Sequence, residues 1–329
     1  MSGALQLRFH FGERDRDGDG PLDVAVMDAC ARHGVWAAAL LRGVEGFGAN
    51  ARMRTERLLS LSEDQPLVAV AVGEAPAIEA LAEEVVEIAA EGLLVLEEVE
   101  VATAGSPIAA AGAGEPGVGS AADVARATIW GARSGPRSPH LRAVDALHRH
   151  GAESAIVLLG VDGVLDGERR RARFVAGNRG VPAMTVAVGE RAALAAALAE
   201  LGPLADFVAF EGVERSSVDD RGKLHGVRVA LATSEATQCA SGPLYLEFIH
   251  ALRRGGAPGA TALRGVWGFR GDVAPHGDRV LALRRDVPVI VETVDSAERA
   301  AKWREVAESL AGGPDVVHSQ PVPTIFTLD

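Results

Sequence analysis

Glycine and arginine residues gather in two short segments that have the composition of an anion site. The first segment reads LRGVEGFGANARMR from Leu41, and the second reads LRGVWGFRGD from Leu263. Backbone amides of a glycine-rich turn can approach a phosphate, and a neighbouring guanidinium can bind two of its oxygens. The G-x-x-G-x-G spacing is neither the Walker phosphate loop nor the dinucleotide-binding fingerprint, so the motif alone does not name a ligand.

The candidate ligand-binding residues come from these two segments, which we expect to be loops. The arginines would supply charge, the glycines close backbone approach, and the phenylalanines either a stacking face or a buried anchor. The candidates are Arg42, Gly43, Gly46, Phe47, Gly48, Arg52, Arg54, Arg264, Gly265, Gly268, Phe269 and Arg270. A structural explanation stays open, because glycine also serves wherever the backbone needs a positive φ.

No other group of residues has the spacing of a catalytic or metal-binding set. The histidines of HRH (148–150) follow a helix end, where cations are favourable. The aspartates of RDRDGDG (14–20) lack the glutamate that a calcium loop needs at its twelfth position. We therefore expect a protein that is not an enzyme and that holds no metal and no resident cofactor.

The elements that position the two segments form a repeat. GPLDVAVMDACARHG (20–34) precedes the first segment, and GPLYLEFIHALRRGG (242–256) precedes the second. A fainter middle copy contains AVDALHRHG (143–151) and LLGVDGV (158–164). The sequence therefore contains three copies of one unit.

Prolines mark the same point in each copy. Each of them opens an apolar run, at Pro66, Pro182 and Pro288. An arginine stands at a constant distance before each proline, at Arg57, Arg173 and Arg279. These arginines fit a repeated structural ion pair as well as they fit a ligand contact.

Within a copy, the periodicity predicts the order β-α-β-β-α-β. The segment LQLRFHFG (5–12) alternates as a strand does, and the following helix should open near Pro21 and stop near Gly34. Val26 and Cys30 share one face of this helix, so Cys30 is expected in the core. This order is the ferredoxin-like plan, and we predict an α+β chain of three tandem ferredoxin-like domains.

The composition of the joints sets the predicted domain boundaries. These are residues 1–101 for domain 1, 102–124 for a flexible linker rich in Ala, Gly, Pro and Ser, 125–214 for a degenerate domain 2, 215–226 for a second linker, and 227–329 for domain 3.

The middle copy departs from the motif of the other two. Leu159 replaces the arginine, and carboxylates stand in GVDGVLDG (160–167), where they would repel a phosphate. A basic run follows, with Arg169, Arg170, Arg171 and Arg173. We expect three unequal inter-domain clefts, of which one or two bind ligand.

Composition excludes several classes of partner. The net charge of −12 argues against a nucleic-acid partner, which would need a basic face. No apolar run approaches the roughly 20 residues of a membrane span, and the N-terminal residues do not have the pattern of a secretory signal. The two cysteines show no metal-ligand spacing. We expect a cytoplasmic protein.

The first and third copies resemble the domain of unknown function 190 family, a PII-like group. The residues that carry the resemblance are RFHFGE (8–13), GPL (20–22), LRGVEGFG (41–48), RLLSLSEDQP (57–66) and LEEVEV (96–101), with GPLYL, GATALRGVWGF and RRDVPVIVETVD in the third copy. The middle copy joins by its position in the repeat.

The resemblance implies a trimeric signalling fold related to the PII and CutA proteins, in which small ligands, often adenine nucleotides, bind between subunits. Three fused copies would form a pseudo-trimer within one monomeric chain. The implied function is a non-enzymatic regulator that binds a small anionic ligand and signals through the Gly/Arg-rich loop. Two alternatives stay open: a ligand-independent interaction protein that regulates an ion channel or transporter, and a weak nucleotide-hydrolysing enzyme.

Overall fold

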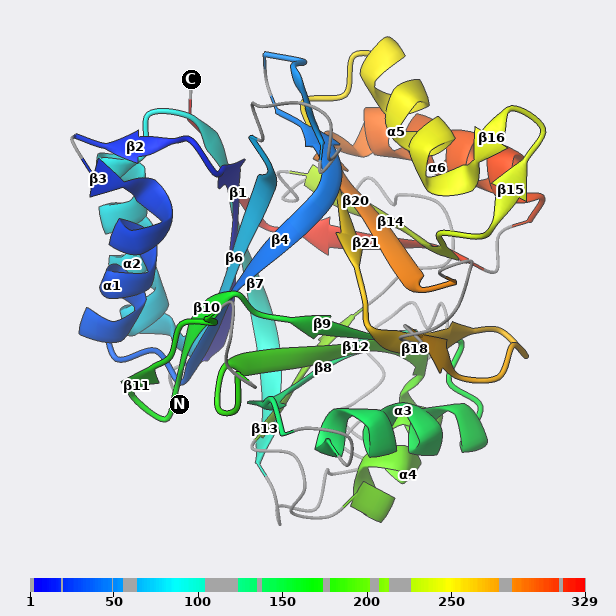
Figure 1. Cartoon of the computed structure of the whole chain (residues 1–329), viewed down its shortest axis with the longest axis horizontal. Helices are drawn as coiled ribbons and strands as arrows, with labels where there is room; N and C mark the ends of the chain where they lie inside the picture. The colour runs from blue at the N-terminus through cyan, green and yellow to red at the C-terminus, as the bar shows by residue number, and fades with distance from the viewer. Residues whose placement is uncertain are drawn as a thin grey trace.

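The computed structural model describes residues 3–18, 20–48, 50–55, 64–103, 124–134, 138–173, 178–201, 207–212, 226–277, 286–313 and 316–328. The described chain is a mixed α+β structure with six helices and antiparallel sheets, compatible with ferredoxin-like repeats (Figure 1). We call residues 4–103, 124–212 and 226–328 the first, second and third units.

The first unit contains a four-stranded antiparallel sheet and two helices. Its main elements are β1 (Ala4–Gly12), α1 (Leu22–Arg32), β4 (Ala37–Phe47), β6 (Pro66–Glu74), α2 (Ala75–Ile88) and β7 (Gly92–Thr103). Strand β1 pairs with β6 and β7, and β6 pairs with β4, so the spatial order is β7-β1-β6-β4. The short strands are β2 (Arg16–Asp17), β3 (Gly20–Pro21) and β5 (Met53–Thr55).

The second and third units repeat this arrangement. The second contains β8 (Val124–Ala132), α3 (Pro139–Arg149), β9 (Ser154–Leu159), β10 (Asp162–Leu165), β11 (Glu168–Arg169), β12 (Pro182–Glu190), α4 (Arg191–Leu201) and β13 (Phe207–Gly212). The third contains β14 (Gly226–Ser234), β15 (Gln238–Cys239), β16 (Gly242–Pro243), α5 (Leu244–Arg254), β17 (Ala260–Arg264), β18 (Trp267–Arg270), β19 (His276–Gly277), β20 (Pro288–Asp295), α6 (Ala297–Ala311), β21 (Val317–Val322) and β22 (Thr324–Leu328). Their spatial orders are β13-β8-β12-β9 and β21-β14-β20-β17.

Helix α1 shows how the sequence sets an element. It begins after Pro21, whose missing amide donor costs nothing there, and the chain leaves it through Gly34 at a φ of +65°. Val26 and Cys30 are both fully buried on the face that packs on the sheet. The core position expected for Cys30 is confirmed, and burial raises the pKa of its thiol to about 12.

Three helix pairs lie on the outside of the molecule, and the sheets face one another inside (Figure 1). Each helix pair covers one face of its own sheet and forms an apolar core there. The opposite faces share a central apolar cluster, which contains Leu41 and Val70 of the first unit, Trp130 of the second, and Leu263 and Ile290 of the third. The sheets join at their edges into one 18-stranded sheet.

Both glycine-rich segments are partly strands, because β4 includes residues 43–47 and β18 includes residues 267–270. The expectation of a loop is wrong for these residues. Strand β4 continues through Phe47 and pairs with β17 of the third unit, so that Phe47 lies opposite Ala260. Strand β18 pairs with β9 of the second unit, and β10 pairs with β4 of the first. The three units therefore close a ring through one kind of strand pairing.

One glycine in each copy permits this approach. A Cβ placed on Gly46 would lie 2.6 Å from the carbonyl oxygen of Ala260, which is a clash with fixed backbone. The matching glycines, Gly163 and Gly268, would each place a Cβ 2.2 Å from a carbonyl oxygen of the neighbouring unit. A structural requirement thus explains the second glycine of the motif in all three copies.

The residue after this glycine anchors each unit in the next one. Phe47 of the first unit is buried in the helix-side core of the third, and Phe269 of the third in that of the second. Val164 of the second unit occupies the helix-side core of the first. The alternative of a buried anchor is therefore the one observed for both phenylalanines.

We predict that Gly46→Ala destabilises the protein and that Gly48→Ala does not. The new methyl group at position 46 must displace the backbone of Ala260, which should cost about 1–3 kcal/mol of unfolding free energy. A methyl group added to Gly48 would meet no atom within 4 Å, so this residue serves as the matched control. The midpoint of thermal unfolding, followed by circular dichroism, measures both changes. Equal midpoints for the two variants would contradict the strand-pairing role.

Candidate functional site

The two arginines that begin the motif are held by carboxylates of their own units. Arg42 donates to Glu13 Oε1 at 2.5 Å, and Arg264 donates through Nε to Glu235 Oε1 at 2.5 Å. Neither arginine lines the two deep clefts described below. Their assignment as ligand contacts stays a prediction, and a ligand would have to compete with these ion pairs.

A cleft opens between the first and third units and encloses about 740 Å³ of space, its solvent-facing mouth included. Three of the candidate residues line it, namely Phe47, Gly48 and Arg54. Its other walls come from β1, β6 and β7 on one side and from β17 and β20 on the other. We call this space the first–third cleft.

His10 is the most unusual group in the first–third cleft. Burial lowers its pKa to about 4, so the imidazole is neutral at neutral pH. Its Nδ1 lies 3.4 Å from Thr261 Oγ1. Its Nε2 is buried and has no hydrogen-bond partner among the residues that the structure describes. A polar ligand atom could pair with it there.

Arg54 does not give the first–third cleft a positive charge. Its guanidinium lies 3.5 Å from Asp15 and 3.3 Å from Asp64. Asp15, Glu91 and Glu292 also line the cleft. Burial raises the pKa of Asp15, against the effect of the Gly12 amide and Arg54. This cleft is therefore unfavourable for a strongly anionic group.

A second cleft, the second–third cleft, encloses about 550 Å³ between the units for which it is named, its mouth included. Of the candidates it contains Phe269 and Arg270, and Arg270 Nη2 lies 3.5 Å from Thr237 Oγ1. Arg126 and Arg228 line it as well, and no carboxylate is among its described lining residues. Its electrostatic character is the opposite of that of the first–third cleft.

A buried ion-pair network joins the three units behind the clefts. Glu292 of the third unit lies 3.1 Å from both Arg8 of the first and Arg126 of the second. Arg228 lies 3.1 Å from Glu97. Burial alone would raise the pKa of Glu292, but Arg8, Arg126 and Arg228 lower it far below its ordinary value. Both cleft arginines are thus held in place by charge.

This network was not predicted from the sequence. The available signal was a single charged residue inside an otherwise apolar strand, as with Arg8 in LQLRFHF, Arg126 in VARATIW and Glu292 in PVIVETV. A charge at such a position has to find a partner, because a lone buried ion is very costly. The partners lie in other units, which no local pattern reveals.

At the third junction of the ring, between the first and second units, an aromatic side chain stands in the place of His10. His10, Trp130 and Ala232 are equivalent, because each pairs with the residue two places after the repeated proline. Trp130 is fully buried in the central apolar cluster. The three positions are therefore unequal, while the number that bind ligand stays a prediction.

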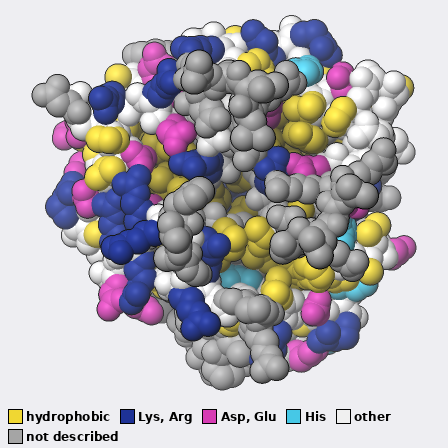
Figure 2. Space-filling model, viewed as in Figure 1, with side chains coloured by type: hydrophobic (Ala, Val, Ile, Leu, Met, Phe, Trp, Pro, Cys, Tyr) yellow, Lys and Arg dark blue, Asp and Glu magenta, His cyan; other side chains and the backbone are white. Residues whose placement is uncertain are grey.

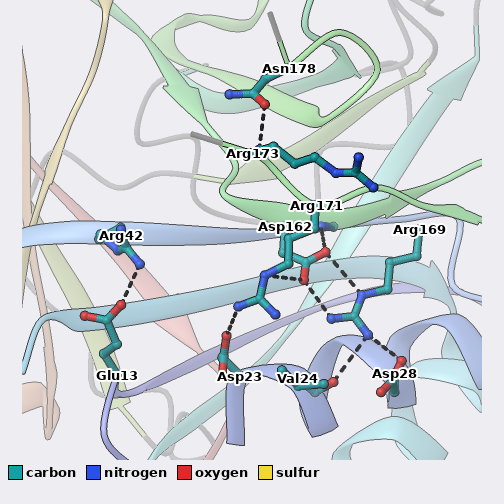
Figure 3. Close-up of polar contacts among 11 residues, drawn as sticks. Glu13, Asp23, Val24, Asp28, Arg42, Asp162, Arg169, Arg171, Arg173 and Asn178 are labelled. Carbon is teal, nitrogen blue, oxygen red and sulfur yellow. Dashed lines mark hydrogen bonds and ion pairs between the residues drawn. The ribbon is translucent and has the colours of Figure 1, made fainter. Parts of the chain in front are cut away.

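The carboxylate of the middle copy is neutralised by its own arginines. Figure 2 shows Lys and Arg side chains gathered at the left of the face, over the region of β10 and β11. Buried Asp162 lies 2.7 Å from Arg169 and 3.7 Å from Arg171 (Figure 3). Arg169 also pairs with Asp28, and Arg171 with Asp23 at 2.9 Å. These pairs compensate the charge of Asp162, whereas Asp166 of the same segment is exposed, and the expected repulsion of a phosphate stays a prediction.

The other candidates lie apart from the two clefts. Gly43 and Gly265 face the neighbouring unit, where a Cβ would meet the carbonyl oxygen of Ala262 at 3.0 Å and Ile156 at 2.4 Å. Arg52 is exposed and donates its backbone amide to Asn50. The repeated residues Arg57 and Arg279 fall outside the described residues, and the backbone amide of Arg173 bonds to Asn178 Oδ1 at 2.7 Å.

Within the described residues, no group of three or more His, Cys, Asp or Glu side chains could hold a metal ion. No helix in the same part of the chain is both long and apolar enough to cross a membrane.

We predict that the unfolding free energy falls as the pH drops from about 6.5 to 5. Burial lowers the pKa values of His10 and His140 to about 4, whereas in the unfolded chain both should titrate near 6.5. The unfolded state then binds more protons, which favours unfolding on acidification. Urea titrations at several pH values give the slope of the unfolding free energy against pH. His10→Gln and His140→Gln should each reduce this slope by the equivalent of nearly one proton. A slope that neither substitution changes would contradict the buried, neutral assignment.

One comparison with known proteins bears on this structure. The family model DUF190, described as an uncharacterized ACR, matches residues 4–101 and 226–323. The two matched segments coincide with the first and third units, and together they cover more than half of the chain. The matched residues include β4, β17 and β18, and hence most of the walls of both clefts. The chain therefore belongs to the DUF190 family.

Proposed function

We propose that this protein is a non-enzymatic, PII-like regulator that binds an adenine nucleotide in the second–third cleft. One observation carries the proposal: Arg126, Arg228 and Arg270 line that cleft without a carboxylate among its described lining residues. Glu292 and Glu97 already pair with Arg126 and Arg228 behind the cleft, so Arg270 supplies the charge that has no ion-pair partner among the described residues. On a chain of net charge −12, such a local positive charge favours an anion.

The walls of the cleft suit the other parts of a nucleotide. Ile156, Val186 and Ile290 offer apolar surface for a base, and Ser154 and Thr233 offer hydroxyl groups that can fix its orientation. Because buried carboxylates already hold Arg126 and Arg228, little reorganisation is needed when an anion binds.

The architecture supports a PII-like pseudo-trimer. The strand orders of the three units match those of a ferredoxin-like fold, and the units close a ring as three subunits of a trimer would. In this proposal the chain is a monomer whose clefts between units take the place of clefts between subunits. The first–third cleft, with its carboxylates, is then a poorer nucleotide site.

Signalling would pass through the chain that follows the cleft strands. A phosphate on Arg270 would contact the end of β18 and bias the segment that follows it. Residues 56–63 and 278–285, which the sequence places after the glycine-rich segments, lie outside the described residues. A channel or transporter remains the candidate partner that would read the change.

We predict that isothermal titration calorimetry with ATP, ADP and AMP detects one site per chain that belongs to the second–third cleft. Arg270→Ala should weaken ATP binding by about 10- to 100-fold, the cost of losing a charge-assisted hydrogen bond. Arg264→Ala is the matched control, because Arg264 belongs to the same segment but pairs with Glu235 outside the cleft.

The two variants separate the competing assignments. Weaker ATP binding in Arg264→Ala, with unchanged binding in Arg270→Ala, would favour the glycine-rich segment over the second–third cleft as the ATP site. Arg54→Ala reports on the first–third cleft in the same way. Absence of heat and of saturation with all three nucleotides would overturn the proposal in favour of a ligand-independent interaction protein.

A further inference from the structure

An arginine-rich depression lies where the second unit meets the first, away from both clefts, and Glu13 and Asp23 of the first unit also line it. It consists of two adjoining hollows that share Arg171, Arg173 and Asn178. Arg133, after the end of β8, lines one hollow, and Arg179 lines the other. Together the two hollows form one solvent-open groove. Figure 2 shows Lys and Arg side chains gathered over the region of β10 and β11.

Some arginines of the groove are already neutralised. Arg169 and Arg171 share Asp162 and pair with Asp28 and Asp23 of helix α1 (Figure 3). Arg170 pairs with Glu168, and Arg42, at the groove's edge, pairs with Glu13. The pairs of Arg169 with Asp28 and of Arg171 with Asp23 join the second unit to the first.

Three guanidinium groups are not neutralised in this way. Arg133, Arg173 and Arg179 have no ion-pair partner among the residues that the structure describes. Arg133 is partly buried, and burial lowers its pKa. An unpaired charge on partly buried Arg133 is unfavourable, and an incoming anion would recover that free energy. Arg173 and Arg179 are exposed.

The backbone fixes the spacing of these cations. The Arg173 amide donates to Asn178 Oδ1 at 2.7 Å, which holds these two lining residues together. Asn178 adopts a φ of +49°, and Arg179 follows it directly. Amide nitrogen Nδ2 of Asn178 remains a hydrogen-bond donor beside the three guanidinium groups.

We propose that this groove is a separate binding site for a linear oligophosphate group, either free or as the tail of a larger molecule. Guanidinium groups bind phosphate oxygens in pairs, and guanidinium groups in two adjoining hollows can contact successive phosphates. The site uses none of the residues of the second–third cleft. It therefore stands or falls independently of the proposed nucleotide site.

The test is calorimetric titration of the full chain with tripolyphosphate, carried out with Arg270→Ala as the background so that the cleft is weakened. We expect one site per chain, with weaker binding as ionic strength rises. Arg133→Ala/Arg173→Ala should reduce the affinity at least 10-fold. Arg149→Ala is the matched control, because it removes an exposed arginine of the same unit that pairs with Glu200 outside the groove.

Each outcome of the tripolyphosphate titration supports or contradicts the proposed groove site. Unchanged affinity in the double variant, or equal losses in the double variant and in Arg149→Ala, would overturn the proposal, as would the absence of binding at low salt. Circular dichroism checks the folding of each variant. If Arg133→Ala/Arg173→Ala unfolds, Arg173→Gln/Arg179→Gln replaces it. Titration with ATP and AMP in the same background separates the two sources: a free oligophosphate site binds tripolyphosphate best, whereas a site for a nucleotide tail binds ATP best.

Discussion

Backbone pairing across the unit boundaries holds this molecule together, and it depends on one small residue in each copy. At Gly46 and at its two counterparts, a neighbouring carbonyl lies where any other residue would place a Cβ. The close approach lets the next side chain, such as Phe47, enter the core of the neighbouring unit. Both clefts lie where these strands end, so the strand pairing also determines where a ligand could bind.

Charge then distinguishes sites that the fold makes similar. The first–third cleft carries Asp15 and Glu91 beside Arg54, whereas the second–third cleft presents only arginines as charged lining residues within the described chain. The third position holds Trp130 in the place of His10. One repeated backbone thus supports an acidic cleft, a basic cleft and a filled position.

Local pattern in the sequence was enough to predict the elements but not their partners. The end of α1 and the buried place of Cys30 follow from periodicity and from Gly34. The glycine-rich segment was expected to be a loop, because its pairing strand belongs to another unit and leaves no trace nearby. Likewise, the partner of Arg42 stands far from it in sequence, and the arginines of the basic cleft come from three separate strands. The strand pairing of the glycine-rich segment and the partners of these arginines both depend on residues that are far apart in the sequence.

The buried ion pairs have a consequence for symmetry. Gln6, Arg126 and Arg228 occupy the same position in the three units, and all three belong to one connected network with Glu97 and Glu292. Three identical subunits would have to repeat the same charge at each of these places, and like charges would meet around the axis. Fusion into one chain removes that constraint, so unlike residues can neutralise one another at the centre. The same freedom lets each junction of the ring specialise without altering the other two.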